Sequence, residues 1–173
     1  MTTNPFKPPE TDSTKNPPPP GTPGQPLLAV LAGLAVDIGG SAVVGFAIGV
    51  IHVASLAAQG LTEAQVQEAL AQFPRDSPLS IAATLIGALL SVLGGYVCGR
   101  MARRVEYRAG LAMAAVSTVY GLLMAQAAHE TGEMTLLLTA ATVACNLLGV
   151  KYGAEHNRRA EARRGTDGDS AAP

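Results

Sequence analysis

The stretch that decides the fold is Leu27–Val53, which reads LLAVLAGLAVDIGGSAVVGFAIGVIHV and is apolar or small except for Asp37 and His52. A helix needs about 20 mostly apolar residues to cross a bilayer, because the hydrocarbon core is about 30 Å thick. In lipid, only helices and closed barrels satisfy the backbone, and this stretch lacks the alternation of a barrel strand. It therefore predicts a transmembrane helix.

Three more stretches have the same character, and two of them, at 79–99 and 109–129, contain no Asp, Glu, Lys or Arg. The fourth, at 133–153, is somewhat less apolar. The sequence therefore predicts an all-α integral membrane protein whose transmembrane domain, 27–153, is a four-helix bundle. Its spans are expected at about 27–53, 79–99, 109–129 and 133–153.

Both flanks of this domain are polar. Residues 1–26 are rich in proline, which cannot continue a helix, and predict a disordered cytoplasmic head. Residues 154–173 predict a charged cytoplasmic tail. Glu155–Arg164 can extend the fourth helix through Glu–Arg pairs, and disorder is expected after Gly165.

The lysines and arginines set the orientation of the chain. With four crossings, almost all of them fall on one side, and only Arg75 lies on the other. Positive loops stay in the cytoplasm, so we expect both termini there. The expected partners are the lipid bilayer itself and anionic lipid headgroups at the cytoplasmic arginines.

The first outer loop is expected to hold a short amphipathic helix. Thr62 and Gln65 have the spacing of a weak capping box, apolar residues then recur near one face, and Pro74 and Pro78 end the segment. Such a helix lies on the membrane surface or covers the bundle.

Small residues recur at every fourth position of the spans. Close packing in lipid depends on such residues, so these stripes predict helix contacts, above all an antiparallel hairpin of the first two spans. A homo-oligomer interface, or contact with another membrane protein, is the alternative interpretation. The predicted packing glycines are Gly33, Gly45, Gly49, Gly87, Gly95 and Gly99.

Asp37 is the most informative residue, because an ionised carboxylate inside a membrane costs several kcal/mol unless it is paired, hydrated or protonated. It lies on the small-residue face, so it should point at other helices. The polar residues at the same depth are Ser91, Thr118 or Ser117, and Asn146. The predicted intramembrane polar cluster is Asp37, Ser41, Ser91, Thr118 and Asn146. It either couples a proton or cation to movement or fixes helix register.

Other classes of function lack support. The chain has 12 Lys+Arg against 13 Asp+Glu, a balance that argues against nucleic-acid binding. No nucleophile elbow, phosphate loop, Cys-x-x-Cys or zinc spacing occurs. We therefore expect no enzyme, no catalytic residue, no metal and no cofactor.

Two short motifs resemble a known group of proteins. Asn4–Pro9 is similar to the Asn-Pro-aromatic-x-x-Pro start of many small bacterial membrane proteins. Gly94–Ala102 resembles a Gly-Gly-Tyr-x-x-x-Arg-x-Ala signature that closes the second helix of some uncharacterised four-span proteins. The resemblance implies a multi-pass protein of the bacterial inner (plasma) membrane and no catalytic activity. The expected role is accessory or structural. The alternative is a proton- or cation-coupled transporter or channel subunit that works through Asp37.

Overall fold

The computed structural model describes residues 25–71, 77–127 and 132–169, and every regular element within them is helical. The predicted head, 1–26, lies outside these residues except for its last two. The elements are α1 (Pro26–Leu34), the π-helical turn η1 (Ala35–Gly39), α2 (Gly40–Ala58), α3 (Glu63–Ala71), α4 (Pro78–Met101), α5 (Glu106–Ala127) and α6 (Glu133–Asp169).

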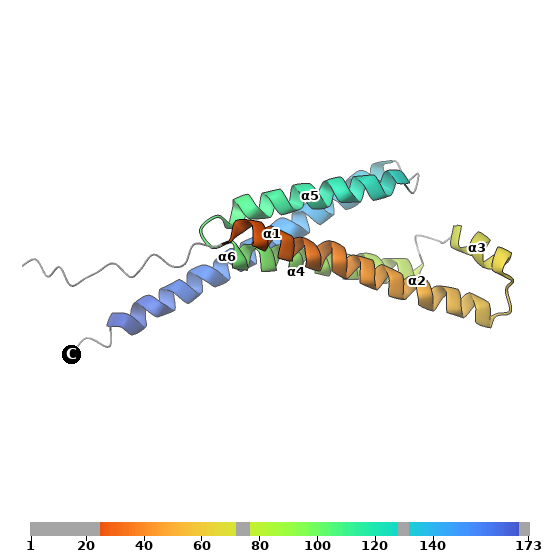
Figure 1. Ribbon diagram of the computed structural model, residues 1–173, viewed down its shortest axis with the longest axis horizontal. Helices are drawn as coiled ribbons and strands as arrows, with labels where there is room; N and C mark the ends of the chain where they lie inside the picture. Colours follow the sequence, from red (N-terminus) through yellow and green to blue (C-terminus); the bar gives the residue numbers. More distant parts are fainter. Residues whose placement is uncertain (1–24, 72–76, 128–131, 170–173) are drawn as a thin grey trace, which may run out of the picture.

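Four helices are long and apolar enough to cross a membrane, as predicted: Pro26–Ala58, Pro78–Met101, Glu106–Ala127 and Glu133–Arg163. The first comprises α1, η1 and α2 in one continuous run (Figure 1). Two of the four begin with proline in the first turn, where its missing N–H costs nothing. At α4 the Oγ of Ser77 accepts the N–H of Ser80 at 3.1 Å and caps the helix.

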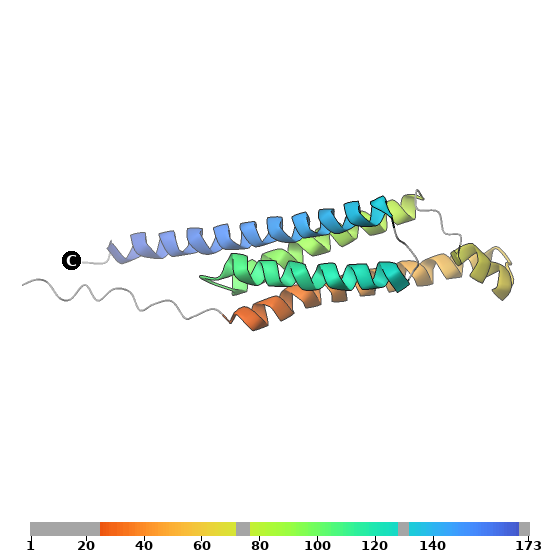
Figure 2. The same ribbon diagram turned by 90° about the horizontal axis from the view of Figure 1, so that it is seen from above.

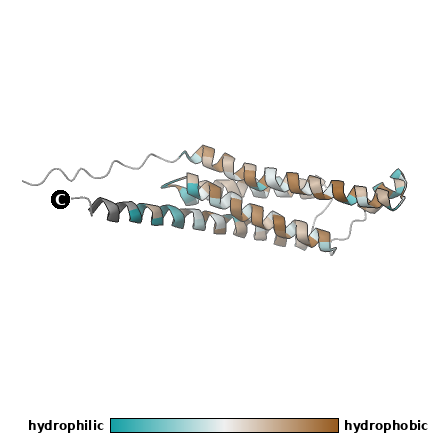
Figure 3. Cartoon of the chain, turned by 90° about the horizontal axis from the view of Figure 1, so that it is seen from below, coloured by the Kyte–Doolittle hydropathy of each residue, from teal (hydrophilic) through white to brown (hydrophobic). Residues whose placement is uncertain are grey.

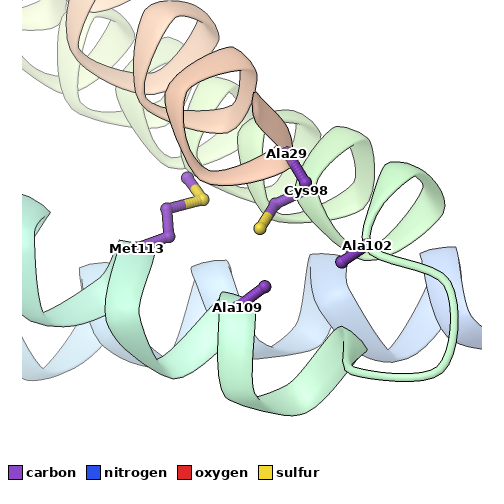
Figure 4. Close-up of a cluster of buried hydrophobic side chains, with 5 residues drawn as sticks. All are labelled: Ala29, Cys98, Ala102, Ala109 and Met113. Atoms are coloured by element: carbon purple, nitrogen blue, oxygen red, sulfur yellow. The ribbon is translucent and has the colours of Figure 1, made fainter. Parts of the chain in front are cut away.

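The helices form an elongated bundle with two different ends (Figures 1 and 2). We call one the α4–α5 end, because the short turn between those helices lies there, and the other the α3 end. At the α4–α5 end, three helices contribute a small buried cluster (Figure 4). Its members are Ala29 of α1, Cys98 of α4, Ala102 just after α4, and Ala109 and Met113 of α5. Four of these five are small, so the backbones lie close together.

The most extensive helix contact joins α4 to α6, which run in the same direction. A Cβ added at Gly95 would overlap the backbone of Asn146, and one at Gly99 would meet the Val150 carbonyl oxygen at 2.6 Å. From the other side, a Cβ at Gly153 would meet the Tyr96 carbonyl oxygen at 2.6 Å. The two backbones therefore touch without intervening side chains, which is how small residues join helices in lipid.

The first two spans also pack together, and there a Cβ at Gly94 would lie 2.7 Å from the Gly33 carbonyl oxygen. Within the single chain, only half of the predicted packing glycines have a neighbouring helix against them. A Cβ at Gly45, Gly49 or Gly87 would meet nothing within 4 Å. These three lie toward the α3 end, where the neighbouring helices spread apart and no backbone comes close enough to need them.

Helix α6 continues through most of the charged tail and ends at Asp169. Disorder was expected after Gly165, but the chain stays helical for four more residues. Its polar part extends past the rest of the bundle, while the shared part of the bundle carries the apolar surface (Figure 3). The continuation follows from Ala, Glu and Arg in the tail, all of which favour the helix.

Helix α3 occupies the loop in which a short helix was expected. The backbone N–H of Thr62 donates to Gln65 Oε1 at 2.9 Å, which is one half of a capping box. Val66 is its buried residue, and the helix contacts the end of α2.

Candidate functional site

Asp37 lies at the centre of the bundle and is 5% exposed. Its Oδ1 accepts a hydrogen bond from Ser91 Oγ at 2.6 Å, and its Oδ2 accepts one from Ser117 Oγ at 2.7 Å. Asn146 Nδ2 is a third and longer donor to Oδ2, at 3.4 Å. The donors belong to α4, α5 and α6, so this one carboxyl group links all four long helices.

The backbone that carries Asp37 is not α-helical. Asp37 is the middle residue of the π-helical turn η1, whose hydrogen bonds close a wider ring than those of an α-helix. Gly39 and Gly40 follow at once, and a Cβ on Gly40 would meet the Leu90 side chain at 3.1 Å. Single π turns inside α-helices occur often at functional sites.

The structure brings together three of the five residues predicted for the polar cluster: Asp37, Ser91 and Asn146. Thr118 is not bonded to the carboxyl group, and its neighbour Ser117 takes that place. Successive residues of a helix point about 100° apart, and Ser117 is the one that shares the buried face of α5. Ser41 lines the cavity described below but makes no hydrogen bond to Asp37.

Asn146 is fully buried, and among the described residues its Oδ1 has no hydrogen-bond partner. An unpaired buried acceptor costs about 1–3 kcal/mol. Turning the amide over would place its oxygen against Oδ2 of Asp37, where it would accept from a protonated carboxyl group. The Asn146 side chain can therefore either donate to the carboxyl group or accept from it, depending on which way its amide is turned.

A cavity of about 250 Å³ lies beside Asp37, on the side toward the α3 end of the bundle. Hydroxyl groups and alkyl groups share its wall. It is lined by Asp37, Ile38, Ser41, Thr84, Gly87, Ala88, Ser91, Ser117, Tyr120, Gly121, Leu138, Ala141, Thr142 and Cys145.

No basic side chain pairs with Asp37 in the part of the chain that the structure describes. Arg100, the nearest candidate in sequence terms, donates instead from Nη1 to Asn157 Oδ1 at 3.1 Å. The three groups that bond to Asp37 are all neutral. The carboxyl group thus lies in a largely apolar setting without a compensating positive charge.

Asn157 forms a second buried polar site, which the sequence did not reveal. It is 5% exposed, and its Nδ2 donates to the carbonyl oxygens of Gly99 and Arg100 at 3.1 and 3.2 Å. These carbonyls end α4 and lack helical partners. The overlooked signal is the small-residue stripe of α6, because Asn157 follows Gly149 and Gly153 at the same spacing of four.

Within the described residues, no group of three or more His, Cys, Asp or Glu is placed to hold a metal ion. Comparison of the chain with models of known protein families, with curated proteins and with solved structures finds no significant match.

Proposed function

We propose that this protein is a non-enzymatic transporter or channel subunit in which Asp37 binds and releases a proton or a small monovalent cation. The observation that carries the proposal is the cavity that adjoins a buried carboxyl group inside the bundle. A carboxyl group that only joined helices would need no such cavity.

The chemistry of the site supports reversible binding. An ionised carboxylate in a membrane interior is costly without a counter-charge, and all three donors to Asp37 are neutral. A proton or a cation supplies the missing charge. Loss of that charge into the cavity changes the free energy of the four-helix arrangement, which couples binding to movement.

For the surroundings we propose a bacterial inner membrane with both termini in the cytoplasm. The α4–α5 end, with Arg100, Arg103, Arg104 and Arg108, then faces the cytoplasm, and its arginines contact anionic lipid headgroups. Helix α3 then lies at the opposite surface, so the cavity would lie on the outer side of Asp37. Labelling single cysteines placed at residues 64 and 103 with an impermeant reagent tests this orientation.

The second candidate is an accessory or structural membrane protein. The hydrogen bonds that join Asp37 to three other helices favour it, because such a network fixes helix register whether or not the acid titrates. Under this alternative, Asp37→Asn should keep a folded protein, and a partner protein should copurify with it.

Infrared difference spectroscopy of the protein in lipid vesicles separates the two. The carboxyl band assigned to Asp37 by its absence from Asp37→Asn should change with pH or with the monovalent cation supplied. In the same vesicles, a pH-sensitive dye should report cation-driven or voltage-driven proton movement that Asp37→Asn abolishes. Thr118→Ala is the matched control, because Thr118 lies beside Ser117 but does not bond to Asp37. A band that never changes, with no flux, would refute the proposal in favour of the structural role.

A further inference from the structure

We infer that the cavity above Asp37 is a binding site for a small amphiphilic organic monocation, an ammonium group on an apolar body. This inference rests on the proposed function and names the class of ligand that competes with the proton or inorganic cation at Asp37.

The charge of the site selects a cation. Among the described residues that line the cavity, Asp37 is the one acidic residue, and none is Lys, Arg or His. Tyr120 adds an aromatic ring, whose face attracts ammonium groups. Anions and zwitterions with a carboxylate next to the ammonium would meet Asp37 without any positive group to offset it.

The wall of the cavity selects an organic body. Ile38, Ala88, Leu138 and Ala141 contribute alkyl surface, and the hydroxyls of Ser91 and Ser117 already donate to Asp37. A bare metal ion would need several oxygen ligands, whereas this wall offers few that are free. A cation with hydrocarbon around its charge loses little hydration and gains apolar contact.

The weakly joined side of the bundle, between α2 and α5, is where we expect such a molecule to enter. Helix α2 packs against α4 and α3, but it has at most slight contact with α5 or α6. Toward the α3 end, α2 and α5 visibly diverge (Figure 1). An amphiphilic cation concentrates at the membrane interface, next to this lateral gap.

The chain contains its own reporters. Cys145 lines the cavity and is partly exposed, whereas Cys98 belongs to the closed cluster at the α4–α5 end and is fully buried. A ligand in the cavity should slow alkylation of Cys145 by N-ethylmaleimide. Cys98 should stay unmodified in the folded protein with or without ligand.

The test uses benzyltrimethylammonium and its uncharged carbon isostere, neopentylbenzene, with the full chain in lipid nanodiscs. Equilibrium dialysis should show saturable binding of the cation, with protection of Cys145 at the same concentrations. The isostere should neither bind saturably nor protect Cys145. Asp37→Asn should weaken binding of the cation by roughly tenfold or more, since it removes the only charge among the described residues of the wall.

A matched pair of glycine variants tests the location. Gly87 lines the cavity, and a Cβ added there would meet no described atom within 4 Å, so Gly87→Leu should fill the space and abolish binding. Gly45 is equally open but lies outside the wall, so Gly45→Leu should bind as the unchanged protein does.

Three results would overturn the inference: equal binding of the isostere, which indicates a groove for lipid chains; undiminished binding to Asp37→Asn; or undiminished binding to Gly87→Leu. An Asp37 carboxyl band that responds to pH but not to benzyltrimethylammonium would reject this ligand class and leave the proposed function intact. A band that responds neither to pH nor to benzyltrimethylammonium would reject both the ligand class and the proposed function.

Discussion

The two ends of the bundle use the same residue type with opposite results. At the α4–α5 end, Gly33, Gly95 and Gly99 meet the backbone of another helix. Toward the α3 end, a Cβ added at Gly45, Gly49, Gly87 or Gly121 would meet no described atom within 4 Å, and a cavity remains beside Asp37. Asp37 lies at the level where glycines packed against another helix give way to glycines without such a neighbour. Small residues permit close packing, but an interface forms only where a second helix lies close enough.

The largest expected loss of stability comes from disrupting the close packing at the α4–α5 end. Gly95→Leu should destabilise the fold by about 3 kcal/mol or more, because the atoms in the way are backbone atoms of Asn146, which cannot move aside as a flexible side chain can. The measurement is the thermal midpoint in detergent, followed by modification of buried Cys98 in a Cys145→Ala background.

Gly45→Leu is the matched control for that variant and should change stability by no more than about 1 kcal/mol, the size of the helix-propensity difference. Equal losses from Gly95→Leu and Gly45→Leu would show that the two ends do not differ in packing.

The next effect concerns the boundary between the ends. Ser91→Ala and Ser117→Ala each remove a donor to the buried Asp37 carboxyl group and should each cost about 1–3 kcal/mol. Because both act on one group, the double variant should deviate from the sum of the two. Chemical unfolding in mixed micelles gives the free energies. Thr118→Ala should stay within about 0.5 kcal/mol. A loss of stability in Thr118→Ala as large as that in Ser117→Ala would show that Thr118 also contributes to the boundary between the two ends.

A smaller effect is expected where α6 supports the end of α4. Asn157→Ala removes the donor to two terminal carbonyls and should cost about 1–2 kcal/mol. Hydrogen exchange around the α4–α5 turn should become faster. Arg158→Ala changes an exposed neighbour and should leave exchange there unaltered. Unchanged exchange in Asn157→Ala would mean that the packed glycines alone hold this end together.

The smallest effect lies in α3. Gln65→Ala removes the acceptor for the Thr62 backbone N–H and should cost the helix about 0.5 kcal/mol, because the bond is exposed. Exchange of the α3 amides measures this loss. Gln67→Ala, also exposed, serves as the control and should leave the α3 amides as they are. An equal effect of both variants would assign the change to helix propensity.

Length and hydropathy predicted the four long helices, because the cost of exposing backbone groups in lipid leaves few alternatives. Counting depth along each span also placed Ser91 and Asn146 beside Asp37, since helices of similar tilt bring equal depths together. Depth does not give the angle around a helix, so Thr118 and Ser117 could not be separated in this way.

What the sequence did not give was where helices spread apart. The stripe that contains Gly33 and Gly45 looks the same at both positions, and only the path of the neighbouring helices distinguishes them. The π turn at Asp37 and the cavity beside it are likewise products of tertiary structure. The capping role of Asn157 was missed because the tail was considered apart from the span that it continues.

The length of α6 has a mechanical consequence. Its 37 residues make a rod of about 55 Å at about 1.5 Å per residue, whereas a bilayer with its headgroups is about 40–45 Å thick. The rod therefore stands clear of the lipid at its polar end. Asn157 ties it to the end of α4, so its direction is fixed where it leaves the bundle. Asp169, the last residue of α6, is therefore held at the far end of a rod whose direction the bundle sets.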